Sequence, residues 1–389
     1  MTSTVSQHGV AFWLSPKILR LLTLALMLGL AGAAVFPVLS THLATGLGIS
    51  PFWIGIFFLL NTAAGIGVSH GLALASDRGL SRVRILWVAV TISALGALAM
   101  GYTTHYGLLL MIGMLWFGLS ATAQPQLFAL AREQISSAEA ALFQSVLRAS
   151  ISFSWIIGPP LAYLLFERIG FTYLMWITSA MFGLALLLLP GLKDAPYQPP
   201  SAVKIPTNRR IKWLFLMMAA IFAANSMYIV YMPLYVRETL GIAGIAPGVL
   251  MGLAAGLEIP LMVGAGAMAH RWPLFRPLWV AVAGGLVFYA GIFLFSSFTL
   301  LMVWQIFNAL LIGLAAGMGI SVFQSLMQDR LGMASTLYSN AIKTGGLVGA
   351  AAGGLIAEWL GYEQVFLGSF FAMVIAFVAL WQCAHKRHN

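Results

Sequence analysis

The chain has 389 residues, of which 61% are hydrophobic and only 8% are charged. A soluble domain of this size carries about a quarter charged residues, so this chain cannot cover itself with a surface that water would solvate. Its net charge of +10 would suit a nucleic-acid-binding protein, but the basic residues lie in short segments between apolar runs, which excludes that class. Composition therefore predicts an integral membrane protein.

The first apolar run, Leu21–Ala44, follows Lys17 and Arg20 and resembles the start of a secretory signal. It is too long for the apolar region of a signal peptide and has no clear cleavage site, so we expect an uncleaved first membrane span. Cys383 is the only cysteine, which leaves no disulfide framework and no metal-ligand cluster of the usual spacing. We therefore expect no metal and no cofactor.

Twelve apolar runs near the spanning length of about 20 residues follow one another along the chain. They lack the period-two alternation of barrel strands, so we expect an all-α fold. Ser50 and Pro51 predict a helix start, and Ser136 with Glu139 predicts a capping box before the fifth span. The predicted spans are Leu21–Ala44, Phe52–Ala75, Ile85–Tyr102, Leu108–Ala131, Ala140–Phe166, Phe171–Leu192, Trp213–Val236, Gly248–Ala269, Leu278–Phe295, Leu300–Met327, Ser335–Ala357 and Val365–Ala384.

The lysines and arginines predict the orientation. Most of the 20 fall in segments on the side of the chain termini, whereas the opposite loops hold only Arg168 and Arg237. Because cytoplasmic loops are enriched in basic residues, both termini are expected in the cytoplasm. The residues on the terminal side are Lys17, Arg20, Arg78, Arg82, Arg84, Arg132, Lys193, Lys204, Arg209, Arg210, Lys212, Arg271, Arg276, Arg330, Lys386 and Arg387.

The longest polar segment divides the spans into six and six. Residues 193–212 contain four prolines and are expected to form a cytoplasmic linker between six-helix bundles at 1–192 and 213–389. The two halves also share short patterns at nearly the same spacing. Glu167 to Phe171 resembles Glu358 to Tyr362, and Gln126 with Arg132 resembles Gln324 with Arg330. Together these matches predict a duplicated six-helix unit.

Five strings along the chain are distinctive: PFWIGIFF (Pro51–Phe58), NTAAGIGVS (Asn61–Ser69), PQLFALARE (Pro125–Glu133), WIIGPPLA (Trp155–Ala162) and GLEIP (Gly256–Pro260). They resemble the bacterial sugar efflux transporter family of the major facilitator superfamily. The resemblance covers nearly the whole chain. It implies the twelve-helix major facilitator fold in the bacterial inner membrane, and proton-linked export of sugars or glycosides by alternating access.

Glu258 is the carboxylate that lies deepest in a predicted span. A charge at the centre of a span costs roughly 3 kcal/mol. Protonating a glutamate with the ordinary pKa of about 4.3 costs roughly 3.7 kcal/mol at pH 7. The two costs nearly match, so Glu258 is the candidate for proton coupling. The alternative is a permanently charged Glu258, paired with Arg148 or Lys343.

Arg148 and Lys343 are the other two ionisable residues placed clearly inside spans. The guanidinium of Arg148 could bind sugar hydroxyls, or it could form a structural ion pair or extend toward the cytoplasm. The role of Lys343 stays open. We count both as candidate substrate-binding residues.

Neutral polar and aromatic side chains inside spans complete the substrate hypothesis, because a sugar needs hydrogen-bonding groups and flat apolar faces. Asn225 with Tyr228 and Gln305 with Asn308 each share one helix face. The alternative for each residue is an interhelical hydrogen bond, which contributes about 0.6 kcal/mol. The set is Asn61, Gln124, Gln126, Trp155, Asn225, Tyr228, Gln305, Asn308 and Asn340.

An enzyme is disfavoured because the sequence has no P-loop and no HExxH motif. The alternative function is efflux of amphipathic drugs by proton antiport, but such a pocket would carry fewer amides. Import also remains open, since the fold does not fix direction. We expect a monomer whose partners are a sugar or glycoside, protons and lipid, without nucleic acid.

Overall fold

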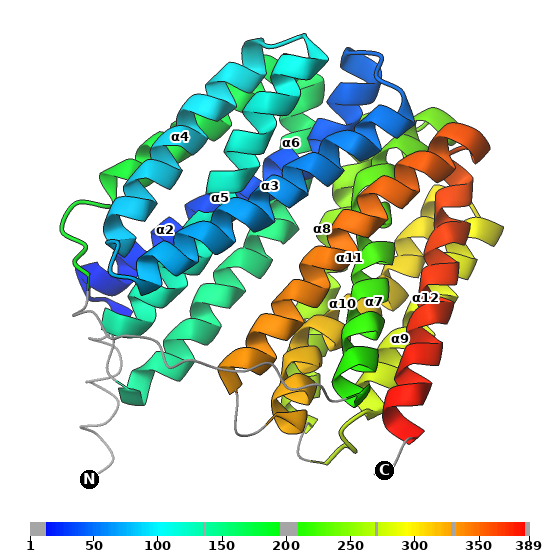
Figure 1. The fold of residues 1–389 in the computed structure, drawn as a ribbon. Coiled ribbons are helices and arrows are strands. Elements are labelled where there is room, and N and C mark those ends of the chain that lie inside the picture. Colours follow the sequence, from blue (N-terminus) through cyan, green and yellow to red (C-terminus); the bar gives the residue numbers. More distant parts are fainter. Residues whose placement is uncertain (1–12, 135–136, 195–208, 269–270, 328–330, 386–389) are drawn as a thin grey trace. The chain divides into compact units, whose positions relative to one another are not determined.

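The computed structural model describes residues 13–134, 137–194, 209–268, 271–327 and 331–385. Over these ranges the chain is helical and contains no strand (Figure 1). Lipid offers no hydrogen bonds to a backbone, and a helix satisfies its own amide and carbonyl groups within one segment. The predicted all-α class is confirmed.

The helices follow the predicted spans closely. The first five are α2 (Pro16–Thr41), α3 (Pro51–Asp77), α4 (Arg82–Tyr102), α5 (Tyr106–Gln134) and α6 (Ser137–Leu187). The next six are α7 (Arg209–Leu234), α8 (Ala246–Met268), α9 (Arg276–Leu294), α10 (Phe298–Leu326), α11 (Leu331–Leu360) and α12 (Tyr362–His385). Short π-helical segments extend α2 over His42–Gly46 and α7 over Tyr235–Thr239.

Helix α6 contains the predicted fifth and sixth spans. Its 51 residues would extend about 76 Å as one straight helix, more than twice the thickness of a membrane core. At Gly170 the backbone leaves the helical region, with φ 83° and ψ 172°. Because this conformation strongly favours glycine, Gly170 divides α6 into two helices between the predicted spans.

Ten helical segments of the described chain are long and apolar enough to cross a membrane. One of them, Ala149–Leu187, holds the paired helices of α6. Helix α11 lies outside this set although it has 30 residues, because its glycines and Asn340, Lys343 and Thr344 lower its mean hydropathy. The count of twelve spans therefore remains a prediction.

Of the two predicted helix starts, one can be compared with the structure in full. Helix α3 begins at Pro51, as Ser50 and Pro51 predict. The capping box falls partly on Ser136, which lies outside the described residues. Helix α4 has a cap that we did not predict, since the Ser81 hydroxyl accepts a hydrogen bond from the Arg84 amide at 3.0 Å.

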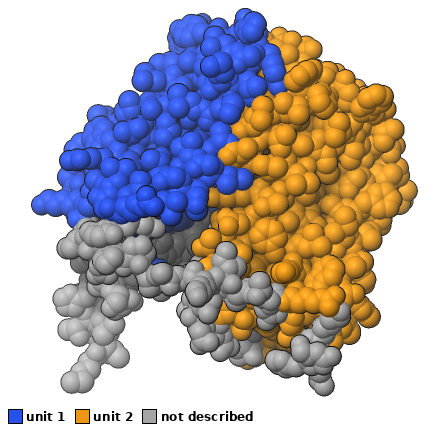
Figure 2. Space-filling model, viewed as in Figure 1, with its two compact units in different colours: residues 1–35, 64–158, 168–200 blue, residues 36–63, 159–167, 201–389 orange. Residues whose placement is uncertain are grey.

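The chain forms two compact units (Figure 2). Unit 1 comprises residues 1–35, 64–158 and 168–200, and unit 2 comprises residues 36–63, 159–167 and 201–389. Two pieces of the first half, 36–63 and 159–167, thus belong to the unit that contains the whole second half. The predicted boundaries at residues 192 and 213 stay a prediction, and most of the linker lies outside the described residues.

Within unit 2, helix α7 packs against α11 and α12. A methyl group on Gly345 would lie 2.3 Å from the Ala219 carbonyl oxygen, and one on Gly349 would lie 2.2 Å from that of Ala223. No side chain fits there, so these two glycines let α7 and α11 approach closely.

Candidate transport site

Glu258 lies on α8 and is partly exposed. Its backbone packs against α10, since a methyl group on Gly313 would lie 3.3 Å from the Glu258 carbonyl oxygen. Neither Glu258 nor Lys343 has an ion pair or hydrogen bond to another described residue. The described side chains therefore contain no Glu258–Lys343 pair, and the Arg148 side chain lies outside them.

Three predicted site residues meet inside unit 2. The Tyr228 hydroxyl donates to Gln305 Oε1 at 3.0 Å, and Asn308 Nδ2 donates to the same oxygen at 3.0 Å. Gln305 Nε2 donates to the Leu301 carbonyl at 2.9 Å. We call Tyr228, Gln305 and Asn308 the amide–tyrosine cluster. Its members are 2%, 0% and 2% exposed, so a sugar cannot reach them without movement of the helices.

Two buried polar atoms, one of them within this cluster, are unsatisfied. Asn308 Oδ1 in the cluster and the Tyr289 hydroxyl on α9 have no hydrogen-bond partner among the described residues. The Phe288 ring lies 5.4 Å from that of Tyr228 and 4.8 Å from that of Tyr289. Sequence reasoning did not select Tyr289, because a tyrosine within an apolar run gives no signal that it will face other polar groups.

Other predicted residues make local contacts. Asn61 is fully buried, and its Nδ2 donates to the Phe57 carbonyl of the same helix at 2.6 Å. In unit 1, Gln126 accepts a hydrogen bond from Arg82 at 3.0 Å. The Gln126 bond joins α4 to α5 and is the interhelical alternative, whereas the Asn61 bond stays within α3. In this structure neither side chain is free to bind a sugar through the bonded atom.

The remaining candidates are accessible. Asn225 is partly exposed and Asn340 is exposed, and neither forms a hydrogen bond with another described residue. Gln124 and Trp155, in unit 1, are partly exposed as well. Amides without protein partners suit sugar hydroxyls, because each can donate and accept.

Unit 2 also contains a contact between first-half and second-half helices, at the start of α3 and the end of α11. A methyl group on Gly354 would lie 2.9 Å from Gly55 Cα, 2.9 Å from the Pro51 carbonyl oxygen and 2.9 Å from the Tyr231 hydroxyl. The Tyr231 hydroxyl donates to the Ala350 carbonyl at 2.9 Å. We call the contact of Gly354 on α11 with Gly55 and Pro51 on α3 the end contact.

Polar interactions reinforce the end contact. The Phe52 amide, at the start of α3, donates to Glu358 Oε2 at 3.0 Å. Glu167, near the break in α6, forms an ion pair with Arg237. Both glutamates belong to the pattern that the two halves share, but sequence reasoning used them only as signs of duplication.

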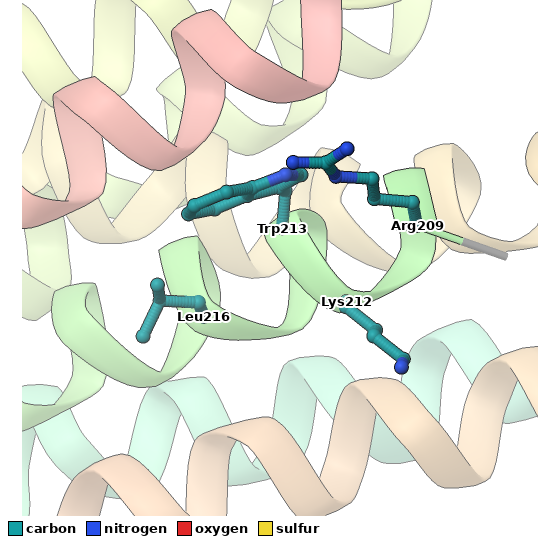
Figure 3. Close-up of a pocket in the computed structure, with 4 residues that line it drawn as sticks. All are labelled: Arg209, Lys212, Trp213 and Leu216. Atoms are coloured by element: carbon teal, nitrogen blue, oxygen red, sulfur yellow. The ribbon is translucent and has the colours of Figure 1, made fainter. Parts of the chain in front are cut away.

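A hollow of about 410 Å³ lies at the start of α7, lined by Arg209, Lys212, Trp213 and Leu216. Figure 3 shows the Arg209 guanidinium beside the Trp213 indole, with Lys212 pointing away from both. Its described lining contains none of the candidate sugar-binding residues. Basic and aromatic side chains at a helix end are typical of the boundary between membrane and water.

The chain matches the family model of the Major Facilitator Superfamily over residues 21–342. It is 40% identical to Sugar efflux transporter A of Escherichia coli (strain K12) over 369 residues, which are 92% of this chain and 93% of that protein. This chain belongs to the major facilitator superfamily. Within it, the chain belongs to the family of the sugar efflux transporters.

Other relatives agree with this assignment. Sugar efflux transporter B of Salmonella typhimurium is 36% identical, with 91% of each chain covered. The solved nucleoside transporter NupG gives a TM-score of 0.79 at 13% identity and covers 96% of this chain and 100% of its own. At that identity it supports the fold alone. The predicted major facilitator fold is confirmed, and this multi-pass membrane protein is a transporter rather than an enzyme.

Proposed function

We propose that this transporter exports sugars or glycosides from the cytoplasm across the bacterial inner membrane in exchange for protons. The observation that carries the proposal is the 40% identity, over 92% of this chain, to a protein named a sugar efflux transporter. The basic residues favour cytoplasmic termini, so the start of α3 and the end of α11 would lie on the outer side.

The proposed cycle is alternating access. While the end contact is formed, the outer side is closed and the substrate site is open to the cytoplasm. When the end contact breaks, the site opens to the outer side. Polar groups of unit 2 that lack partners among the described residues, Asn225, Asn340 and Lys343 among them, would bind sugar hydroxyls. In unit 1, Gln124, Arg148 and Trp155 stay candidates for sugar contacts.

A neutral sugar carries no charge, so uphill export needs an ion that moves in the opposite direction. Glu258 supports a role for protons, because it is a partly exposed carboxylate within a span, without an ion-pair partner among the described side chains. Such a group can take a proton from outside when the protein opens outward and release it when the protein opens to the cytoplasm.

Transport in proteoliposomes, with and without an imposed pH gradient, tests this mechanism. Glu258→Gln resembles the protonated form and cannot release a proton. We expect the variant to keep sugar binding and sugar exchange while it loses accumulation driven by the gradient.

The matched control is Glu363→Gln, which removes an exposed carboxylate at the start of α12 and should leave the gradient response unchanged. A Glu258→Gln variant that follows the gradient like the wild type would exclude Glu258 as the proton carrier. A wild-type protein that moves sugar but ignores the gradient would replace antiport with facilitated diffusion. Transport of amphipathic drugs instead of sugars would reject the proposed substrate class.

A further inference from the structure

The hollow at the start of α7 has two basic side chains in its lining. Arg209 and Lys212 are exposed, and neither forms an ion pair or hydrogen bond with another described residue. The neighbouring Arg210 differs, since it donates to the Cys383 carbonyl at 3.0 Å and its guanidinium lies over the Phe275 ring. Arg210 therefore joins α7 to α12, whereas the two cations of the hollow have no such structural contact among the described residues.

The described residues around this end of α7 offer no acidic group to neutralise the two cations. Helix α7 contains no acidic residue. The glutamates of α11 and α12, Glu358 and Glu363, lie near the opposite ends of those helices. The linker sequence directly before α7, residues 195–208, has no acidic residue either. The positive charge of the hollow thus calls for an anion from outside these segments.

The face of α7 that lines the hollow is covered farther along the helix. Met227 lies eleven residues beyond Leu216, about three turns, and so on the same face. It is enclosed by α11 and α12, because a methyl group on Gly353 would lie 3.3 Å from its Cγ and the Ser369 hydroxyl lies 3.3 Å from its sulfur. Toward the start of α7 these two helices move apart (Figure 1), and Leu216 is 41% exposed. The hollow therefore opens at the side of unit 2, between α11 and α12.

The lining of the hollow matches the parts of an anionic phospholipid. Arginine and lysine donate to phosphate oxygens, tryptophan is enriched at the depth of lipid headgroups, and an exposed leucine packs against hydrocarbon. We propose that the hollow binds one anionic phospholipid. Its phosphate lies at the Arg209 guanidinium, beside the Trp213 indole, Lys212 adds positive potential, and an acyl chain packs against Leu216. A soluble anion would use the cations but not the leucine.

Native mass spectrometry of the purified full-length protein measures this binding. Dioleoylphosphatidylglycerol is the anionic probe, and dioleoylphosphatidylcholine carries the same acyl chains without a net charge. We expect the wild type to retain the first of these lipids in preference to the second. One lysine or arginine near a membrane surface strengthens the attraction of an anionic lipid by about 5-fold. Arg209→Gln and Lys212→Gln should therefore each raise the dissociation constant by about 5-fold, and the double variant by about 30-fold.

Arg276→Gln is the matched control, because it removes the same charge from an exposed position at the start of α9 that is predicted to face the cytoplasm. Arg276 is not among the described residues that line the hollow, so the dissociation constant should change by less than about 2-fold. Leu216→Ser tests the acyl-chain contact and should weaken binding of dioleoylphosphatidylglycerol. Glycerol phosphate, which has the charge but no acyl chain, should not displace the lipid at equal concentration.

Three outcomes would overturn the proposal. Equal losses in Arg209→Gln and Arg276→Gln would mean that any cation on this side attracts the lipid. Equal retention of the two lipids by the wild type would remove the role of charge. Displacement of the lipid by glycerol phosphate would make the hollow a site for a free anion. An unchanged melting temperature in detergent shows that each variant is folded, and Lys212→Gln serves as the test if Arg209→Gln is not.

Discussion

The end contact allows a direct test of the proposed alternating access. Gly354→Ala adds a methyl group 2.9 Å from Gly55 Cα and from the Pro51 carbonyl oxygen. Both are backbone atoms and cannot move aside as a flexible side chain would. Overpacking of this kind costs about 1–3 kcal/mol. The methyl group also lies 2.9 Å from the Tyr231 hydroxyl on α7, but the part of the cost that arises at Gly55 and Pro51 applies only while α3 and α11 touch. The ratio of closed to open forms should therefore fall, by up to roughly 150-fold.

Cross-linking measures this ratio. The buried Cys383 is replaced by alanine, and cysteines are introduced at Phe52 and Glu358, whose amide and carboxylate are hydrogen-bonded at 3.0 Å. A short bifunctional maleimide should join them in the closed form. We expect Gly354→Ala to reduce the cross-linked fraction strongly and to slow sugar export, since each cycle must close this end.

Gly346→Ala is the control on the same helix, because an added methyl group there would meet no atom within 4 Å. Gly55→Ala should act like Gly354→Ala, since its methyl group would lie 3.0 Å from Gly354 Cα. Equal cross-linking in Gly354→Ala and Gly346→Ala would refute the argument that the end contact is released during transport.

Two further predictions concern topology and substrate binding. A reporter that is fluorescent only in the cytoplasm, fused after Asn389, should be fluorescent because Lys386 and Arg387 follow the last span; a periplasmic signal would mean that the number of spans is odd. Asn225→Ala should weaken sugar binding by about 1–3 kcal/mol in a calorimetric titration, because a sugar hydroxyl loses its partner. Asn308→Ala should have a comparable effect if the helices move enough to expose it, and unchanged affinity in both variants would place the sugar elsewhere.

Local sequence signals located most helices well. Each predicted span falls largely within one helix, because twenty consecutive apolar residues allow few alternatives in a membrane. Pro51 marks the start of α3, and Gly170 separates the two spans of α6. Helix α11 was predicted as a span, although it is not among the ten helical segments that are long and apolar enough to cross a membrane.

The candidate site was less predictable. The spacing of Tyr228 and Asn225, and of Gln305 and Asn308, gave the shared helix faces but not their neighbours. Tyr228, Gln305 and Asn308 lie together only because α7 packs on α10 in a particular rotation. The same packing buries them, whereas Asn225, one turn away on α7, stays partly exposed.

The sequence by itself determined three properties. Composition showed that the chain lies in lipid, the length of the apolar runs indicated an all-α fold, and specific strings along the chain indicated the family. Only the tertiary structure decided which polar groups have partners. The sequence left open an ion pair between Glu258 and Lys343, and the described side chains contain none, whereas proton exchange at Glu258 stays a prediction. The glycines of the end contact likewise acquire a role only when Gly55 and Gly354, almost 300 residues apart, touch through their backbones. Contacts between distant segments depend on helix rotation and depth, and periodicity along one segment does not fix either.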